Sequence, residues 1–214
     1  MEILTVCAWT WGDKYGPEYI KRLAAGVARH LRQPFRFRVF TPQEEDLHLT
    51  KIPGCFARLR MFDRSWQAAN EITNRLVCMD LDMVITGPLD DLFDRPEPFV
   101  ILQGANQSNP CPFNGSVMML RAGAHPEVWS DFSVDAARGV PFDSFPDDQG
   151  WLAHKLPGAA GWKCGSESGI YAFRKRSWPK SDALPSVARI VAFPGHRDPS
   201  QFTRLDWVRD NWAA

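Results

Sequence analysis

The sequence predicts one α/β domain with a mixed, mostly parallel sheet flanked by helices. The chain opens with an apolar segment, a helical segment and an alternating segment, and strand–helix–strand is the unit of parallel sheets. Short apolar runs then alternate with helical patterns up to the C-terminus. A chain of 214 residues can bury one substantial core, and it contains no internal repeat or low-complexity linker. We therefore expect a single domain over residues 1–214.

The first unit covers residues 2–40. Glu2–Trp9 is apolar and β-branched, as a central strand would be. Pro17 occupies a suitable first position for a helix. The apolar residues that follow it recur at helical spacing, at Ile20, Leu23, Ala24, Val27 and Leu31. Phe35–Phe40 alternates with period two and predicts the second strand.

The later elements are predicted in the same way. Helical patterns cover residues 56–66, 125–138, 147–156 and 203–212. Short apolar runs predict strands at residues 76–80, 98–103, 115–120, 169–173 and 188–193. For the C-terminal helical segment, packing onto the domain is favoured over contact with an acceptor or a membrane surface.

Composition restricts the classes of function. Lys plus Arg equals Asp plus Glu at 25 each, which argues against a large basic surface for nucleic acid. The five cysteines form no C-x-x-C pair and are expected to be reduced thiols. The N-terminus lacks the basic start and long apolar region of a signal peptide, and no apolar run reaches transmembrane length. We expect a cytoplasmic protein without a transmembrane segment.

Two carboxylates follow the buried strand in the segment NRLVCMDLDMVITGPLDDLF. Asp80 ends the apolar run and Asp82 lies two residues later, so both would face one side if the strand continued. Carboxylates repel each other and resist burial, so a metal ion, a basic side chain or water should lie beside them. Ligands bind beyond the carboxyl ends of parallel strands, and hard oxygen ligands suit Mg²⁺ or Mn²⁺. A D-x-D pair alone is weak evidence, because ordinary composition often produces one.

The combination of motifs is more specific. The segments WGDKYG, LVCMDLDMVITGPLDDLF, FNGSVMML and DDQGWL occur in this order. Together they resemble the nucleotide-sugar-dependent glycosyltransferases of the GT-A fold, most closely the retaining group around glycosyltransferase family 8 and its bacterial relatives. The resemblance implies a Rossmann-like GT-A domain that transfers a sugar from a UDP-sugar to a hydroxyl acceptor (a glycan, lipid or protein). It also implies retention at the anomeric carbon and a Mn²⁺ or Mg²⁺ cofactor.

The resemblance assigns roles to residues near the first strands. Thr10, Trp11 and Tyr15 match the region that receives the nucleotide base, with ordinary loop packing as the alternative for the two aromatic rings. Arg58 matches a basic residue that contacts the donor sugar or phosphates. A solvated helix face is its alternative interpretation, and Arg60 is the substitute candidate.

Further roles follow along the chain. Asp80 and Asp82 match the metal-binding pair, with Asp82 favoured for direct ligation. The sugar pocket would be lined by Asn114 and by the backbone near Gly115 and Ser116, although the glycine could serve only a bend.

The helix that begins with DDQGWL carries two more predicted roles. Asp148 would hydrogen-bond donor hydroxyls, and Gln149 would lie below the anomeric carbon. The alternative is that Asp147 and Asp148 only cap the helix.

The C-terminal loop departs from the family pattern of His-Phe-x-Gly followed by Lys-Pro. In AFPGHRDP, Ala192 stands at the position of the metal-binding His and Asp198 at that of the phosphate-binding Lys. His196, as a metal ligand, and Arg197, as a phosphate ligand, could replace them from a shifted loop.

Two other functions stay open. A haloacid-dehalogenase-like phosphatase also ends a buried strand with D-x-D and uses the first Asp as nucleophile. The pair lies far from the first strand here, which fits that class poorly. The altered C-terminal loop also permits a nucleotide-sugar-binding domain without turnover.

Overall fold

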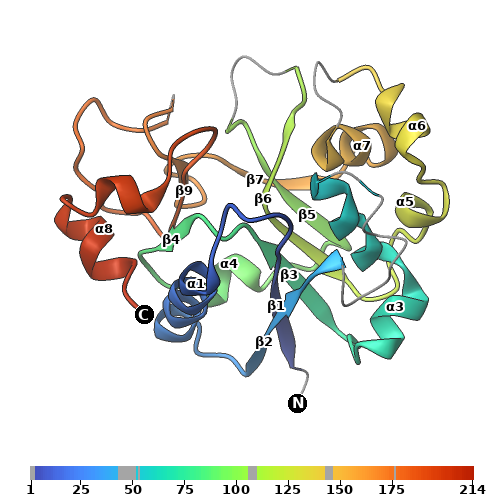
Figure 1. Cartoon of the computed structure of the whole chain (residues 1–214), viewed down its shortest axis with the longest axis horizontal. Coiled ribbons are helices and arrows are strands. Elements are labelled where there is room, and N and C mark those ends of the chain that lie inside the picture. Colours follow the sequence, from blue (N-terminus) through green and yellow to red (C-terminus); the bar gives the residue numbers. More distant parts are fainter. Residues whose placement is uncertain (1–2, 43–51, 53, 106–109, 143–146, 176) are drawn as a thin grey trace.

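The structure is a computed structural model that describes residues 3–42, 52, 54–105, 110–142, 147–175 and 177–214 (Figure 1). A larger sheet has the strand order β2 (Phe35–Phe40), β1 (Leu4–Trp9), β3 (Arg75–Met79), β6 (Phe113–Arg121), β5 (Phe99–Gln103), β7 (Ala160–Lys163). A smaller sheet has the order β4 (Met83–Ile85), β9 (Ile190–Ala192), β8 (Ile170–Ala172). In the larger sheet only β6 runs antiparallel to its neighbours, so the predicted mixed, mostly parallel sheet is confirmed.

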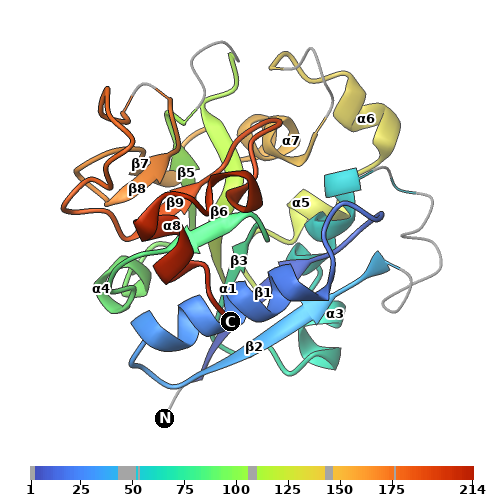
Figure 2. The same ribbon diagram turned by 60° about the vertical axis from the view of Figure 1, so that its left-hand side comes forward.

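Helices cover both faces of the larger sheet. The helices of the described residues include the α-helices α1 (Pro17–His30), α3 (Arg64–Ala69), α4 (Asp90–Phe93), α5 (Glu127–Ser130), α6 (Val134–Arg138), α7 (Asp148–Lys155) and α8 (Asp206–Asn211). They also include the 3₁₀ helices η2 (Gly54–Phe62) and η3 (Pro199–Phe202). One face packs on η2, α3, α5, α6 and α7, and the other on α1, α4 and the smaller sheet. Helix α8 contacts β4, and in the view of Figure 2 it lies in front of β9.

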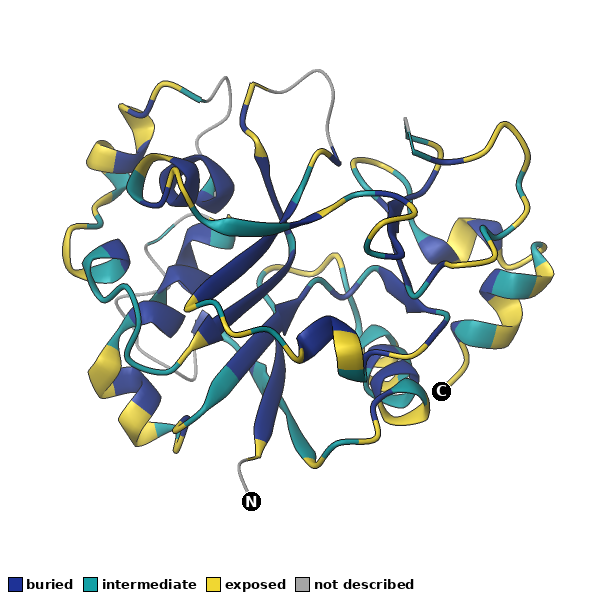
Figure 3. Ribbon diagram, turned by 180° about the vertical axis from the view of Figure 1, so that it is seen from behind, coloured by how far each residue is buried: buried dark blue, intermediate teal, exposed yellow. Residues whose placement is uncertain are grey.

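Strand β3 shows why the central strands read as unbroken apolar runs. Leu76 and Cys78 pack into the core on one face, and Val77 and Met79 into the core on the other. Successive side chains of a strand point to opposite faces, so a strand covered on both sides is apolar at every position. Figure 3 shows these central strands as buried along most of their length.

Two predictions about the elements were wrong in detail, and the condition that the strand continues past Asp80 is not met. Residues 56–66 form η2 followed by α3, because Asp63 starts a new helix by accepting a hydrogen bond from the Ser65 N–H at 2.8 Å. Residues 125–138 form two short helices, because Ser133 accepts from the Ala136 N–H at 3.1 Å and begins α6. The strand before Asp80 ends at Met79 instead of continuing, and the chain enters the smaller sheet at Met83.

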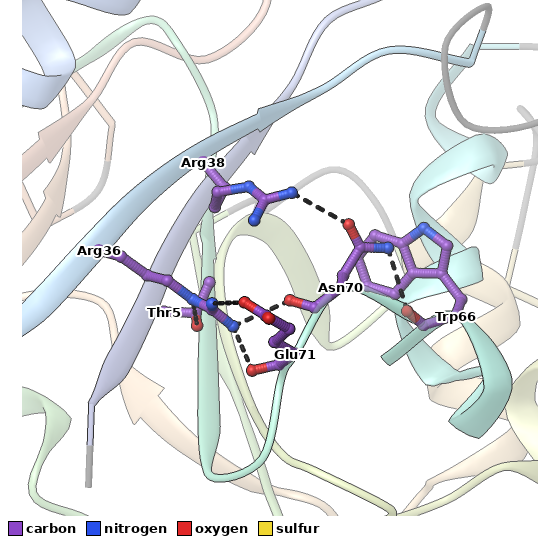
Figure 4. A network of polar contacts seen from close by, with 6 residues as sticks. All are labelled: Thr5, Arg36, Arg38, Trp66, Asn70 and Glu71. Carbon is purple, nitrogen blue, oxygen red and sulfur yellow. Dashed lines mark hydrogen bonds and ion pairs between the residues drawn. The ribbon is translucent and has the colours of Figure 1, made fainter. Parts of the chain in front are cut away.

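A polar network fixes the α3–β3 connection to the edge of the larger sheet (Figure 4). Arg36 on β2 donates to the Thr5 hydroxyl at 2.9 Å and to the Asn70 and Glu71 carbonyls, and it pairs with the Glu71 carboxylate at 3.3 Å. Arg38 donates to the Asn70 side chain at 3.2 Å. Glu71 has a φ of 55°, so these bonds hold a left-handed turn between the end of α3 and the start of β3.

No helix in the described part of the chain is both long and apolar enough to cross a membrane. All five cysteines are free, as predicted, and Cys7, Cys78 and Cys111 are buried. The C-terminal segment packs onto the domain, where the buried ring of Trp212 lies 5.2 Å from that of Tyr19 on α1.

Candidate active site

A cavity of about 600 Å³ opens beyond the carboxyl ends of β1 and β3. The start of β6, the N-terminus of α7 and the loop after β9 complete its walls. This is the edge of an α/β sheet at which ligands bind. The predicted site residues on its walls are Trp11, Tyr15, Arg58, Asp80, Asp82, Asn114, Gly115, Ser116, Asp148 and Gln149.

Arg58 lies at the centre of the site. Its Nε donates to Asp148 Oδ2, and its Nη1 donates to Asp80 Oδ1 at 2.7 Å. Arg58 is 5% exposed and Asp148 is 2% exposed. Burial by itself would lower the pKa of Arg58, but the charges of Asp148 and Asp80 outweigh it and hold that pKa well above its usual range. A basic side chain therefore compensates Asp80, and Arg58 is not on a solvated helix face.

Arg60, the substitute candidate, faces elsewhere. It pairs with Asp63 at 2.9 Å, and its guanidinium lies 5.0 Å from the centre of the Trp129 ring. It is not among the residues that line the cavity.

Asp82 has a different environment from Asp80. Its Oδ2 accepts a hydrogen bond from the Tyr15 hydroxyl at 2.6 Å, and no described cation forms an ion pair with it. Burial, followed by the charge of Asp80, raises the pKa of Asp82 to about 7. Of the two carboxylates, Asp82 is thus the one without an ion-pair partner among the described residues, although the charge of Lys14 acts to lower its pKa.

The two carboxylates suit a divalent cation that also binds phosphate. Mg²⁺ commonly takes one or two carboxylates from the protein and completes its shell with water and substrate phosphates. Asp80 and Asp82 lie on one wall of the cavity and supply such a pair. In the described ranges, no group of three or more His, Cys, Asp or Glu side chains is arranged to hold a metal. A metal here would therefore need oxygens from its substrate.

The two aromatic candidates for the base site differ. The Tyr15 ring packs against Tyr19 at 4.9 Å, and the Lys14 ammonium lies 4.6 Å from its centre. Burial and the charge of Asp82 raise the pKa of Tyr15, so its hydroxyl keeps the proton that it donates. Trp11 is half-buried and also lines the cavity, and the Arg58 guanidinium lies 6.0 Å from the centre of its ring.

The start of β6 brings its backbone against Arg58. A Cβ atom at Gly115 would clash with Nη2 of Arg58 and would lie 3.4 Å from Asp148 Oδ2. Asn114 is buried and accepts from the Ser116 N–H at 3.1 Å. The glycine therefore permits close approach of the guanidinium.

The two acidic residues at the start of α7 have different roles. Asp147 is the cap, since its Oδ1 accepts from the Gly150 N–H at 3.0 Å. Asp148 points to Arg58, and the Gln149 side chain accepts from the Gly115 N–H at 3.4 Å. Capping explains Asp147 and leaves Asp148 for another role.

The structure does not bring every candidate to the cavity. Thr10, His196 and Arg197 are not among its lining residues, and His196 is exposed. Ala192 is buried in β9. Asp198 is engaged elsewhere, because it accepts from the Tyr19 hydroxyl at 2.8 Å and from the Ser200 N–H at 2.9 Å, capping η3.

Sequence reasoning missed several lining residues, among them Lys14, Cys55 and Lys175. Lys14 lies inside the WGDKYG segment that carried the resemblance, so its position was available as a signal. Burial and the charge of Asp148 raise the pKa of the Cys55 thiol. Lys175 follows β8 in a segment without a motif, and only the pairing of β8 with β9 places it here.

No family model and no curated protein match the sequence. Solved glycosyltransferase structures do match the fold. One is a glycosyltransferase involved in glycosylation of the major capsid of PBCV-1, with a TM-score of 0.56, 16% identity and 98% of each chain covered.

Two further glycosyltransferases are similar. GlyE of Streptococcus pneumoniae TIGR4, in its apo form, has a TM-score of 0.62 and 14% identity over 99% of this chain and 63% of its own. The galactosyltransferase LgtC, in complex with donor and acceptor sugar analogues, has a TM-score of 0.54 and 13% identity over 99% of this chain and 97% of its own. At these identities the comparison shows a fold shared with glycosyltransferases, which confirms the expected glycosyltransferase fold.

Proposed function

We propose that the protein is a glycosyltransferase that moves a sugar from a UDP-sugar to a hydroxyl acceptor, with retention and with bound Mn²⁺ or Mg²⁺. The observation that carries the proposal is the arrangement in one cavity of Asp82 and of the Asp80–Arg58–Asp148 ion-pair chain. The shared fold with glycosyltransferases supports it, as do the order and spacing of the motifs.

Asp80 and Asp82 would hold the cation, with Asp82 as the principal ligand. When bound, the ion neutralises charge on the departing nucleoside diphosphate. Asp82 is suited to this role because it has no ion-pair partner among the described residues. Tyr15 would orient its carboxylate through the 2.6 Å hydrogen bond.

The donor sugar would lie between β6 and α7. Asp148 uses Oδ2 to accept from Arg58, which leaves Oδ1 to accept from a sugar hydroxyl. Asn114, the Gly115 backbone and Gln149 line the same side of the cavity. Trp11 would stack on the base.

In the proposed reaction, the bond between the anomeric carbon and the β-phosphate oxygen breaks, and its electron pair stays on that oxygen. The acceptor hydroxyl then bonds to the same face of the anomeric carbon and gives its proton to the departing phosphate. Asp148 is held by Arg58, which supports this front-face path over a covalent intermediate. Catalysis would then rest on positioning and charge neutralisation. The acceptor class stays open among a glycan, a lipid and a protein.

A binding domain without turnover is the second candidate. The observation that favours it is that His196 and Arg197, which were expected to complete the site, lie outside the cavity lining. A phosphatase is disfavoured, because the fold matches glycosyltransferases along at least 98% of the chain in the three structures compared.

The direct test measures the release of UDP from a panel of UDP-sugars in the presence of Mn²⁺, monitored by ³¹P NMR. Hydrolysis of the donor is used because it requires no known acceptor. We expect release from one sugar, and a fall of about a hundredfold in Asp148→Asn and Gln149→Ala. Asp131→Asn, an exposed residue outside the cavity, is the control. Binding of UDP without release from any sugar would favour the binding domain, and hydrolysis of simple phosphomonoesters would favour the phosphatase.

A further inference from the structure

The cavity walls carry an uneven set of charges. Their described Asp, Lys and Arg side chains are four carboxyl groups and three basic groups, namely Asp80, Asp82, Asp147 and Asp148 with Lys14, Arg58 and Lys175. Such walls do not favour a diphosphate unless some cations remain available to it.

The three cations are not equally available. Arg58 is committed to two carboxylates, and Lys14 lies over the Tyr15 ring. Within the described ranges, the ammonium of Lys175 makes no hydrogen bond, ion pair or ring contact. Lys175 is therefore the cation with the least competition from the protein.

The smaller sheet places Lys175 beside the altered C-terminal loop. Strands β8 and β9 are parallel and pair Ala172 with Ala192. Both strands leave the sheet at the same edge, and the Phe173 N–H still donates to the Ala192 carbonyl at 2.8 Å. Lys175 and Gly195 follow these paired alanines by the same number of residues, and both line the cavity.

Asp82 lies at the same edge of this sheet. Strand β4 runs antiparallel to β9 and pairs Met83 with Ala192, so Asp82 precedes β4 where β9 ends. Lys175 and Asp82 thus flank the exit of β9 from opposite sides. Two strand spacings separate β4 from β8, which amounts to about 10 Å. A diphosphate together with a lysine side chain can cross that span.

Arg174 supports a fixed direction for its neighbour. It has a φ of 54°, a left-handed conformation that is uncommon for a residue with a side chain. Its guanidinium binds the Asp182 carboxylate at 2.7 to 2.9 Å and lies over the Phe173 and Phe202 rings. The turn therefore commits Arg174 to the protein and leaves Lys175 on the cavity wall.

We infer that Lys175 binds the diphosphate of the nucleotide donor and neutralises charge on it as the bond to the sugar breaks. The inference rests on the proposed function. Asp198 stands at the position of the phosphate-binding lysine of the resembled family, but here it accepts a hydrogen bond from Tyr19 and caps η3. Lys175, which follows the neighbouring strand β8, would supply the cation for the phosphates instead.

The test compares UDP with uridine by calorimetry, with Mn²⁺ present throughout, in the wild type and in Lys175→Met, Lys175→Arg and Lys180→Met. Lys180 is exposed, lies outside the cavity lining and serves as the matched control. We expect Lys175→Met to weaken UDP binding about ten- to a hundredfold and to leave uridine binding unchanged. Lys175→Arg should retain most UDP affinity because it keeps the charge, and Lys180→Met should match the wild type.

The possible outcomes distinguish failure of the role of Lys175 from failure of the proposed function. If Lys175→Met binds UDP as the wild type does, or loses UDP and uridine equally, the role of Lys175 is overturned and the proposed function stands. If the wild type binds neither compound, the proposed function is overturned, and the role of Lys175 with it.

Discussion

The guanidinium of Arg58 lies so close to the backbone of Gly115 that a Cβ atom at this position would clash with Nη2. This approach lets Arg58 reach Asp148 on α7 and Asp80 after β3 at the same time. Three segments far apart in the sequence are thereby fixed around one buried cation. A glycine in FNGS is thus required by the ion-pair chain.

Gly115→Ala should displace Arg58 and weaken both the fold and ligand binding. Inserting a methyl group into a packed site costs about 1 to 3 kcal/mol. We expect a loss of unfolding free energy in this range in urea titrations, together with a loss of UDP binding. The control is Gly158→Ala, because a Cβ atom at Gly158 meets nothing within 4 Å. Equal stability of the two variants would show that Arg58 does not need this space.

Arg58→Met should destabilise the protein more than Arg60→Met does. Removing one partner of a buried ion pair leaves an uncompensated charge, which costs about 3 to 5 kcal/mol. Asp148, 2% exposed, would be that charge. Arg60→Met loses a half-buried pair with Asp63 and a contact with the Trp129 ring, but it leaves no fully buried carboxylate unpaired, and it serves as the control. Urea unfolding measures both, and a second substitution, Asp148→Asn, should recover part of the loss.

Tyr15→Phe should weaken Mn²⁺ binding in the presence of UDP without abolishing it. The substitution removes the hydroxyl that donates to Asp82 at 2.6 Å and keeps the ring. Loss of a hydrogen bond that orients a metal ligand usually costs about ten- to a hundredfold in metal affinity. Electron paramagnetic resonance of Mn²⁺ measures the free ion. Tyr19→Phe, whose hydroxyl bonds to Asp198, should leave the affinity unchanged, and equal effects of the two substitutions would contradict the role of Tyr15.

Trp11→Ala should weaken uridine and UDP by the same factor. Stacking of a base on an aromatic ring contributes about 1 to 3 kcal/mol, so the loss should be about five- to 150-fold. Calorimetry with both compounds measures it. This pattern is the opposite of that expected for Lys175→Met, which should spare uridine. A loss confined to UDP would place Trp11 near the phosphates.

The sequence was informative where a side-chain pattern reflects local geometry. Pro17 marks the start of α1, and the unbroken run through Met79 marks a strand covered on both faces. The split of residues 56–66 depended on Asp63, whose preference for a helix start was not weighed against the apolar spacing. The predicted strands at residues 169–173 and 188–193 form β8 and β9. Their assembly with β4 into a second sheet could not be predicted, because it depends on pairing between residues that are distant in the sequence.

In the candidate site, too, residues within local motifs could be predicted, and contacts between distant residues could not. Arg58, Asp80, Asp82 and Asp148 were found because motifs carry them, and all four line one cavity. The mutual pairing of Arg58 with Asp80 and Asp148 could not be foreseen, since it joins residues that are remote in the chain. Lys175 was missed for the same reason.

The most direct test of the central claim is thermal stabilisation by UDP, with GDP, ADP and CMP for comparison, each with Mn²⁺ and with EDTA. A ligand that binds only the folded protein raises its melting temperature by mass action. At a ligand concentration a hundred times Kd, the free energy of unfolding increases by about 2.7 kcal/mol. The account predicts a rise with UDP and Mn²⁺ that disappears with EDTA and in Asp82→Asn. A rise that is indifferent to metal, or no rise with any of the four nucleotides, would contradict it.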